Sequence, residues 1–267
     1  MKTKLLVMAF TQIFLVACGS GNNLQNDLSQ KASDNSIKGT TDPSGCNSST
    51  SPFGGGNGRD NNPYLICSAA QLGSMAQSFS PSYFALTADL DMTNERHLYL
   101  GTAVVGSFDG RGHTIRNFNA HLEMDQEGGY LFGQLFTTNE IMAEIKNLNL
   151  DNFQIRTNSI FGTAALVGSN SGKITNVHVT GNISGQDLVG GIVANNFGTI
   201  LDSSFSGSIQ GKQIIGGITG RSTGHLIKNC QVSGQVSGES LVGGIFGEAD
   251  KKSDLMENRV VVSCMDL

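Results

Sequence analysis

Three carboxylates in the first half of the chain have the spacing best suited to catalysis. Asp89 and Asp91 alternate along a predicted strand, and Asp109 follows within the run Phe-Asp-Gly-Arg-Gly-His. Glycoside hydrolysis requires two carboxyl groups roughly 5 to 10 Å apart, and two acids on one strand face can meet that distance. The run around Asp109 is more typical of a tight turn whose carboxylate accepts backbone hydrogen bonds. We therefore expect turn geometry at Asp109, with catalysis and calcium binding as the alternatives.

A serine near the C-terminal end has the spacing of a hydrolase nucleophile. Residues 220–224 are Gly-Arg-Ser-Thr-Gly, a pattern that forms a nucleophile elbow only where a strand turns into a helix. The same slot holds Gly-Ser-Asn-Ser-Gly at 168–172 and Ala-Asn-Asn-Phe-Gly at 194–198. Recurrence at a fixed period indicates a structural corner, so we expect no catalytic serine here.

The cysteines indicate disulfides rather than a metal site. Cys46 and Cys67 flank a glycine-rich loop, and Cys230 and Cys264 lie near the other end of the chain. If successive segments stack along an axis, cysteines close in sequence are also close in space, which favours pairing of Cys46 with Cys67. The other two either form a second disulfide or leave Cys230 as a buried thiol. No cysteine or histidine pair has the close spacing of a zinc site, so we expect no metal, and we expect no cofactor.

Four short glycine-rich blocks show that the second half of the chain is repetitive. They are Ala165–Gly168, Gly191–Ala194, Gly217–Gly220 and Gly244–Gly247, and they recur at intervals of 26, 26 and 27 residues. A unit this short cannot bury its own apolar side chains, so successive units must stack. Glycine costs a helix about 1 kcal/mol at each position, which argues against helical repeats. We expect an all-β fold, a right-handed parallel β-helix with short strands separated by glycine corners.

A second set of blocks aligns between the first and supplies the columns of this solenoid. One column holds Asn147, Asn176, Asp202, Asn229 and Asn258, types that tolerate a left-handed corner and can hydrogen-bond between coils. Inward columns are expected at Ile174/Ile200/Ile227, Val177/Ser203/Cys230, Val179/Phe205/Val232 and Ile183/Ile209/Val236. Strand alternation places Asn149, His178, Ser204 and Gln231 outside. This polar row is either a solvated surface or a face that binds a repetitive polymer by matching its spacing.

The segment before the repeats differs in pattern. Ser68 and Gln71 fit a capping box, and Leu72 and Met75 follow at helical spacing, which predicts a short helix ending near Gln77. Such a helix would shield one end of the stacked core from water. We therefore divide the folded body into a cap with the first coils at 46–127 and repeat coils at 128–267.

Several motifs resemble those of bacterial surface proteins that carry GLUG-motif repeats. They are residues 62–66, 70–72, 83–92 and 106–115, Tyr-Leu-Phe-Gly at 130–133, and the recurring Val-Gly-Gly-Ile. The resemblance runs from about residue 58 to the C-terminus and implies a parallel β-helix in an exported interaction module of the cell surface. Some immunoglobulin-A-cleaving metallopeptidases carry such repeats beside a zinc protease domain. This chain has no His-Glu-x-x-His, so the resemblance does not extend to peptidase activity.

The N-terminus resembles an export signal. Residues 1–17 combine two lysines with an apolar run that is too short to cross a bilayer. Leu-Val-Ala-Cys-Gly at 15–19 resembles the lipobox of bacterial lipoproteins, which implies that Cys18 is the lipidated first residue of the mature chain. An ordinary cleaved signal is the alternative. Residues 18–45 have no aromatic side chain and few large aliphatic ones, and so we expect a disordered tether.

Charge and composition limit the classes of partner that this chain can have. The chain has 17 basic and 22 acidic residues and no tryptophan, which excludes a typical nucleic-acid-binding surface. We interpret it as a lipid-anchored module of the cell envelope, at the outer membrane or cell surface, that contacts the membrane through its lipid and binds an extracellular glycan or protein. A polysaccharide-active β-helix enzyme and a ligand-free structural spacer are the alternatives.

Overall fold

The computed structural model describes residues 45–77, 81–93, 95, 103–122, 134–158, 162–223, 226–250 and 254–266. The chain divides into two units, 1–38 and 39–267, and all described residues belong to the second unit. The predicted signal peptide 1–17, the predicted lipidation residue Cys18 and all of the predicted tether 18–45 except Gly45 therefore lie outside the described residues. No helix among the described residues is long and apolar enough to span a bilayer.

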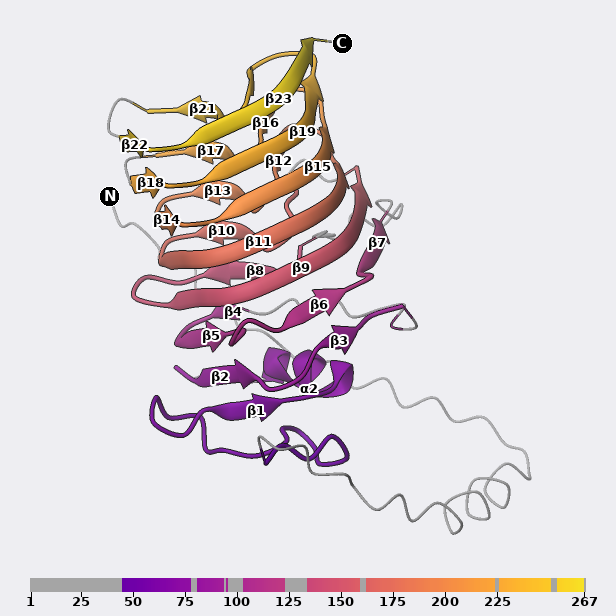
Figure 1. The fold of residues 1–267 in the computed structure, drawn as a ribbon, viewed down its shortest axis with the longest axis vertical. Coiled ribbons are helices and arrows are strands. Elements are labelled where there is room, and N and C mark those ends of the chain that lie inside the picture. Colours follow the sequence, from indigo (N-terminus) through magenta and orange to yellow (C-terminus); the bar gives the residue numbers. More distant parts are fainter. Residues whose placement is uncertain are drawn as a thin grey trace, which may run out of the picture. The chain divides into compact units, whose positions relative to one another are not determined.

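Three parallel sheets form the walls of a β-solenoid of about six turns, which confirms the predicted fold class (Figure 1). The largest sheet contains β1 (Tyr64–Ile66), β2 (Tyr83–Leu86), β3 (Leu90–Asp91), β5 (Ser107–Asp109), β6 (Thr114–Arg116), β7 (Asn119–Leu122), β9 (Glu144–Thr157), β11 (Lys173–Ser184), β14 (Thr199–Leu201), β15 (Ser204–Gln210), β18 (Leu226–Lys228), β19 (Gln231–Gly238), β22 (Asp254–Met256) and β23 (Arg259–Asp266). The second contains β4 (Ala103–Val104), β8 (Phe136–Asn139), β10 (Val167–Asn170), β13 (Val193–Asn196), β17 (Thr219–Ser222) and β21 (Phe246–Ala249). The third contains β12 (Leu188–Gly190), β16 (Ile214–Gly216) and β20 (Val242–Gly243).

The sequence period corresponds to one turn of the solenoid. Ile174 pairs in register with Ile200, which pairs with Ile227, so residues one repeat apart stack directly. Val179, Phe205 and Val232 stack in the same way, and all four predicted inward columns are buried, with at most 2% of any side chain exposed. Burying one such large apolar side chain contributes roughly 1.5 to 3 kcal/mol. The core is therefore continuous from coil to coil, and no coil is stable alone.

Left-handed residues form one corner of each coil. Asn147, Asn176, Asp202 and Asn229 have φ values of 51 to 55°, a conformation that Asn and Asp adopt more readily than other non-glycine residues. Their side chains also join adjacent coils. Asn176 Nδ2 donates to Asn147 Oδ1 at 2.9 Å, and Asn229 Nδ2 donates to Asp202 Oδ1 at 2.8 Å.

The last coil departs from the predicted register by one residue. Lys228 pairs with Met256 and Gln231 pairs with Arg259, so the corner residue opposite Asn229 is Glu257, with φ 54°, and not Asn258. Asn258 instead lies next to the inner column, where its Oδ1 accepts from the backbone N–H of Cys230 at 2.8 Å. Ser203 Oγ accepts from Val177 N in the same way at 3.1 Å. The prediction of Asn258 as a ladder member was wrong because the Met-Glu-Asn run imitates Ile-Lys-Asn one position too late.

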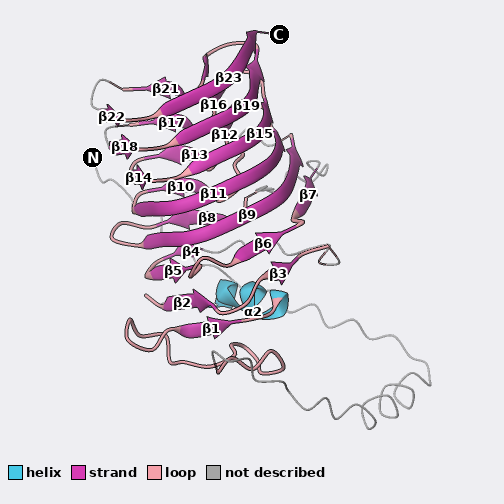
Figure 2. Ribbon diagram, viewed as in Figure 1, coloured by secondary structure: helices cyan, strands magenta, loops and turns pink. Residues whose placement is uncertain are grey.

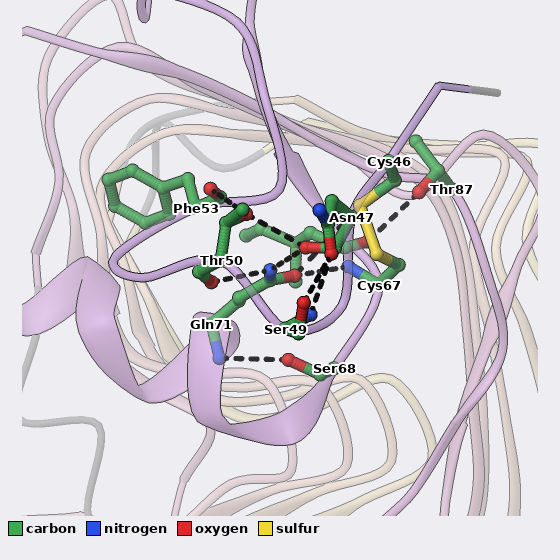
Figure 3. Close-up of a disulfide and its surroundings, with 10 residues drawn as sticks. Cys46, Asn47, Ser49, Thr50, Phe53, Cys67, Ser68, Gln71 and Thr87 are labelled. Carbon is green, nitrogen blue, oxygen red and sulfur yellow. Dashed lines mark hydrogen bonds between the residues drawn. A yellow bond between two sulfur atoms is a disulfide. The ribbon is translucent and has the colours of Figure 1, made fainter. Parts of the chain in front are cut away.

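The N-terminal end of the described body is closed by a disulfide and a short helix (Figures 2 and 3). Cys46 and Cys67 form the disulfide. Helix α2 (Ala69–Ser74) starts at the N-cap Ser68, whose Oγ accepts from Gln71 N at 3.3 Å, and continues as a 3-10 turn, η1 (Met75–Gln77). Leu72 and Met75 are buried in the core, as expected of a cap.

Gln71 ties the helix to the loop that the disulfide closes (Figure 3). Its side chain is 2% exposed; its Oε1 accepts from Cys67 N at 2.9 Å, and its Nε2 donates to Asn47 O at 2.8 Å and Thr50 O at 3.0 Å. The backbone N–H of Gly54 donates to the oxygen of Leu65, and the N–H of Leu65 donates to the oxygen of Gly55, so these bonds cover the outer edge of β1. Every polar atom of the buried amide group therefore has a partner, and the first strand has no bare edge at that point.

Candidate functional site

The outward side of the largest sheet carries the predicted polar row. Asn149, His178, Ser204 and Gln231 are consecutive partners in the parallel register of β9, β11, β15 and β19. The column continues to Thr114 and Asp89 at one end and to Arg259 at the other. The structure thus brings the four predicted residues together, one per coil, because their spacing equals one turn.

A second polar column lies two residues further along each strand. Its members are Asp91, Arg116, Asp151, Thr180, Ser206 and Ser233. Thr180 Oγ1 donates to Asp151 Oδ1 at 2.6 Å, and Ser233 Oγ donates to Ser206 Oγ at 3.0 Å. We call the two columns together the polar face. Several of its side chains are held to one another by such bonds, so this part of the face is ordered before any ligand arrives.

His178 is the most versatile group of the polar face, and both ring nitrogens have partners. Nδ1 lies 2.9 Å from Ser204 Oγ, and Nε2 lies 3.0 Å from Asn176 Oδ1. Asn149 Nδ2 donates to the backbone oxygen of Gly112 at 2.9 Å. The contacts with Ser204 and Asn176 fix the orientation of the His178 imidazole. A fixed imidazole suits recognition by hydrogen bonding better than proton transfer.

Asp89 and Asp91 occupy the N-terminal end of the polar face, and neither resembles a general acid. The backbone N–H of Thr114 donates to Asp89 at 3.0 Å and lowers the pKa of that carboxyl, with His113 Nδ1 3.2 Å away. Hydrogen bonds from Thr93 and Asn117 lower the pKa of Asp91. A glycosidase needs one carboxyl whose pKa is raised so that it stays protonated. Both of these carboxylates are ionised at neutral pH.

Asp109 has the turn geometry expected from its sequence. Its Oδ1 accepts from the backbone N–H of Arg111 at 2.9 Å and from Asn147 Nδ2 at 3.1 Å. Arg111 and Gly112 have φ values of 51° and 81°, so the turn depends on two left-handed residues. The carboxylate stabilises the corner that leads into β6, and its oxygen is already engaged by donors of the chain.

Ser222 lies in a corner and not in a nucleophile elbow. It ends strand β17, its side chain is fully buried, and its Oγ accepts from Asn196 Nδ2 at 3.3 Å. The same slot in the preceding coils holds Asn170, whose Nδ2 donates to Asn196 Oδ1 at 2.7 Å, and Asn139, whose Nδ2 donates to Asn170 Oδ1 at 2.7 Å. We call Asn139, Asn170, Asn196 and Ser222 the buried ladder.

The buried ladder was not predicted, although its slot was aligned correctly. Polar residues at the end of a strand are typical of turns on the surface, and only the folded chain shows that these amides are fully enclosed. The free thiol of Cys230 is also fully buried, which decides between the two alternatives for it. Burial raises the pKa of Cys230 to about 11. In β23, Cys264 pairs in register with Val236, six residues beyond the partner of Cys230.

No group of three or more His, Cys, Asp or Glu side chains in the described part of the chain is arranged to hold a metal ion. The hydrogen-bonded carboxylates discussed above are paired with Thr, Asn, Arg and His instead. Chemistry at the polar face therefore rests on amides, hydroxyls, the imidazole of His178 and a few charged groups near its two ends.

No family model matches this chain. It is similar to halomucin from Haloquadratum walsbyi, with 33% identity over an alignment of 153 residues that covers 52% of this chain and 2% of halomucin. A crystal structure from Bacteroides ovatus, described as a "putative immunoglobulin A1 protease", matches with a TM-score of 0.65 and 25% identity over 80% of this chain and 70% of that one. The solenoid is therefore shared with a solved structure, while the chain spans only a small piece of its curated relative.

Proposed function

We propose that this protein is a lipid-anchored module of the cell surface that binds an extracellular glycan or protein through its polar face. The observation that carries the proposal is the polar face itself. It presents two columns of exposed or half-buried polar side chains in register over successive coils. Cys18 would carry the lipid, and the segment up to residue 45 would act as the tether.

The geometry of the polar face suits a repetitive ligand. Neighbouring strands lie about 4.8 Å apart, so a polymer that runs along the solenoid axis meets an equivalent pair of polar groups at each coil. Ser, Thr and Asn side chains lose little rotamer freedom when a ligand binds, and they offer both donors and acceptors to sugar hydroxyls or peptide amides. Weak contacts repeated over several coils then add up to useful avidity.

The comparisons support the location more than the ligand. Similarity to a segment of halomucin supports a place at the cell surface, and the Bacteroides ovatus neighbour shows that the same solenoid occurs in a protein described as a protease. A catalytic role has less support, because both carboxyls with catalytic spacing have lowered pKa values. A ligand-free spacer would not need an ordered polar face.

The experiment compares attachment of two triple variants to a glycan array and to cells. His178→Ala with Ser204→Ala and Gln231→Ala should abolish binding and leave the melting temperature nearly unchanged, because exposed substitutions shift stability by under about 0.5 kcal/mol. The matched control changes Lys212, Gln213 and Glu239 to Ala, three exposed side chains outside the polar face. Equal loss in both variants, or no loss in the first, would refute the proposed face. If the Cys18→Ser variant stayed in the membrane fraction, the proposed lipid anchor would be refuted.

A further inference from the structure

A hollow lies beside the polar face, beyond a column of glycines. Gly181, Gly207 and Gly234 have φ values of 149°, 145° and 121°, and the pairing of β9 with β11 shifts register between Val179 and Gly181. The long strands β9 and β11 are curved (Figure 1). One residue beyond these glycines, the outward surface of β7, β9, β11 and β15 encloses a hollow of about 320 Å³. A second hollow of about 200 Å³ adjoins it and shares three of its lining residues.

Two further columns of polar side chains line the larger hollow. One column is Asn119, Gln154, Asn182 and Ser208, and the other is His121, Arg156, Ser184 and Gln210, each in parallel register across four strands. Ile155 and Ile183 lie between the two columns in sequence, but their side chains point into the core and are each 2% exposed. The side chains that face the hollow are therefore polar, and such groups can donate to and accept from sugar hydroxyls.

The first of these columns is ordered by its own hydrogen bonds. Asn182 Nδ2 donates to Gln154 Oε1 at 3.1 Å, Gln154 Nε2 donates to Asn152 Oδ1 at 3.0 Å, and the Ser208 hydroxyl donates to Asn182. Each amide keeps a further N–H or lone pair that can face a ligand. Neutral donors and acceptors are therefore fixed along one side of the hollow.

The second column gives the hollow its charge. Arg156 and His121 are direct partners in the β7–β9 register, so the guanidinium and the imidazole belong to adjacent strands about 4.8 Å apart. Both residues line both hollows, and among the described residues no Asp or Glu lines either hollow. This contrasts with the chain as a whole, which has 22 acidic and 17 basic residues. A planar guanidinium is also the side chain best suited to a carboxylate or a sulfate.

We propose that the hollow binds an acidic sugar of an anionic polysaccharide, with Arg156 and His121 contacting the carboxylate or sulfate and the amide column contacting the sugar hydroxyls. This inference deepens the proposed function and rests on it, because it takes the ligand to be a glycan. It places the charged part of the ligand beyond the glycine column, and the polymer would continue across the coils beside the polar face.

The test measures binding of the full chain to two pairs of polymers that differ in charge alone. Polygalacturonate is compared with its fully methylated ester, and dextran sulfate with dextran, so that the two pairs distinguish carboxylate from sulfate. We expect at least one charged polymer to bind and its neutral partner to bind at least tenfold more weakly. Arg156→Gln should weaken the charged interaction roughly tenfold or more, the loss typical of one charge-assisted contact. Arg59→Gln, which removes the same charge from the loop before β1, should bind the charged polymer as well as the unchanged protein does.

Each other outcome overturns the inference. Equal binding of the charged and neutral partners would show that charge is not read, while leaving the proposed glycan-binding function intact. Binding that Arg156→Gln and Arg59→Gln weaken equally would show a diffuse electrostatic effect. Failure of every polymer to bind would reject the anionic ligand, and only a simultaneous failure of the glycan array and cell attachment would reject the proposed function as well.

Discussion

The buried ladder makes a quantitative prediction about stability, tested by Asn170→Ala. The substitution removes two 2.7 Å amide bonds, each contributing about 1 kcal/mol, and strips one partner from Asn139 and one from Asn196 inside the core. Each neighbour keeps a weaker contact at 3.3 Å, Asn139 Nδ2 to Lys173 O and Gly198 N to Asn196 Oδ1, which limits the added penalty to the low end of about 1 to 3 kcal/mol. We therefore expect a loss of about 3 to 4 kcal/mol.

Thermal melting followed by circular dichroism measures this loss. For a body of this size, 3 to 4 kcal/mol corresponds to a melting temperature lower by roughly 10 °C. Ser222→Ala removes the 3.3 Å bond to Asn196 at the end of the ladder, while Asn196 Nδ2 keeps its bond to Gly198 O, and so it should cost less than Asn170→Ala, about 1 kcal/mol for that bond. The control is Ser169→Ala, one residue away in β10 and half-buried, for which we expect a negligible change. If Asn170→Ala melts like the control, the ladder contributes nothing and the reasoning fails.

Three further predictions concern the disulfide, the acidic end of the polar face and the free thiol. Replacing Cys46 and Cys67 by Ser opens a loop with a sequence separation of 21 and should destabilise the protein by about 3 kcal/mol; an unchanged melting temperature would contradict the chain-entropy account. Because the pKa values of Asp89 and Asp91 are lowered on folding, their stabilisation is full above their unfolded pKa of about 3.9 and is lost as the pH falls through the folded values. At pH values below about 4 the melting temperature should therefore fall, and it should fall less in the Asp89→Asn, Asp91→Asn double variant. Equal pH profiles for the two proteins would contradict this prediction. Cys230, fully buried with a pKa of about 11, should resist iodoacetamide at pH 8 until the protein unfolds, as read by peptide mass; rapid labelling of the native protein would show that the column is open.

Periodicity explains why the fold could be predicted from the sequence in detail. Stacking forces residues such as Ile174, Ile200 and Ile227 to share one environment, so each repeat tests the register proposed for the others. The same logic placed His178 beside Ser204. It failed at Asn258, because Met-Glu-Asn at 256–258 resembles Ile-Lys-Asn at 227–229 but is offset from it by one residue in the paired strands.

The buried ladder and the hollow could not be predicted, because burial and the lining of a hollow are properties of the closed coil. Asn170 and Asn196 lie in a slot that is polar in four successive coils, and alternation alone cannot tell an exposed turn from an enclosed amide ladder. The hollow is lined in part by strand β7, which lies before the regular repeats and pairs with β9. Neither feature leaves a periodic signal.

Chemical specificity in this solenoid is therefore to be sought where the columns vary. A position that keeps its type through every coil, such as the inward column of Ile174, is constrained by stacking and carries no information about a ligand. Within the column that contains Ser184 and Gln210, the coils at the N-terminal end hold His121 and Arg156 instead. An arginine at a position where later coils hold Ser and Gln is not needed for folding, because the position is exposed. It alters what the surface can bind, and this is why the hollow, rather than the more uniform part of the polar face, is the better place to test for ligand selectivity.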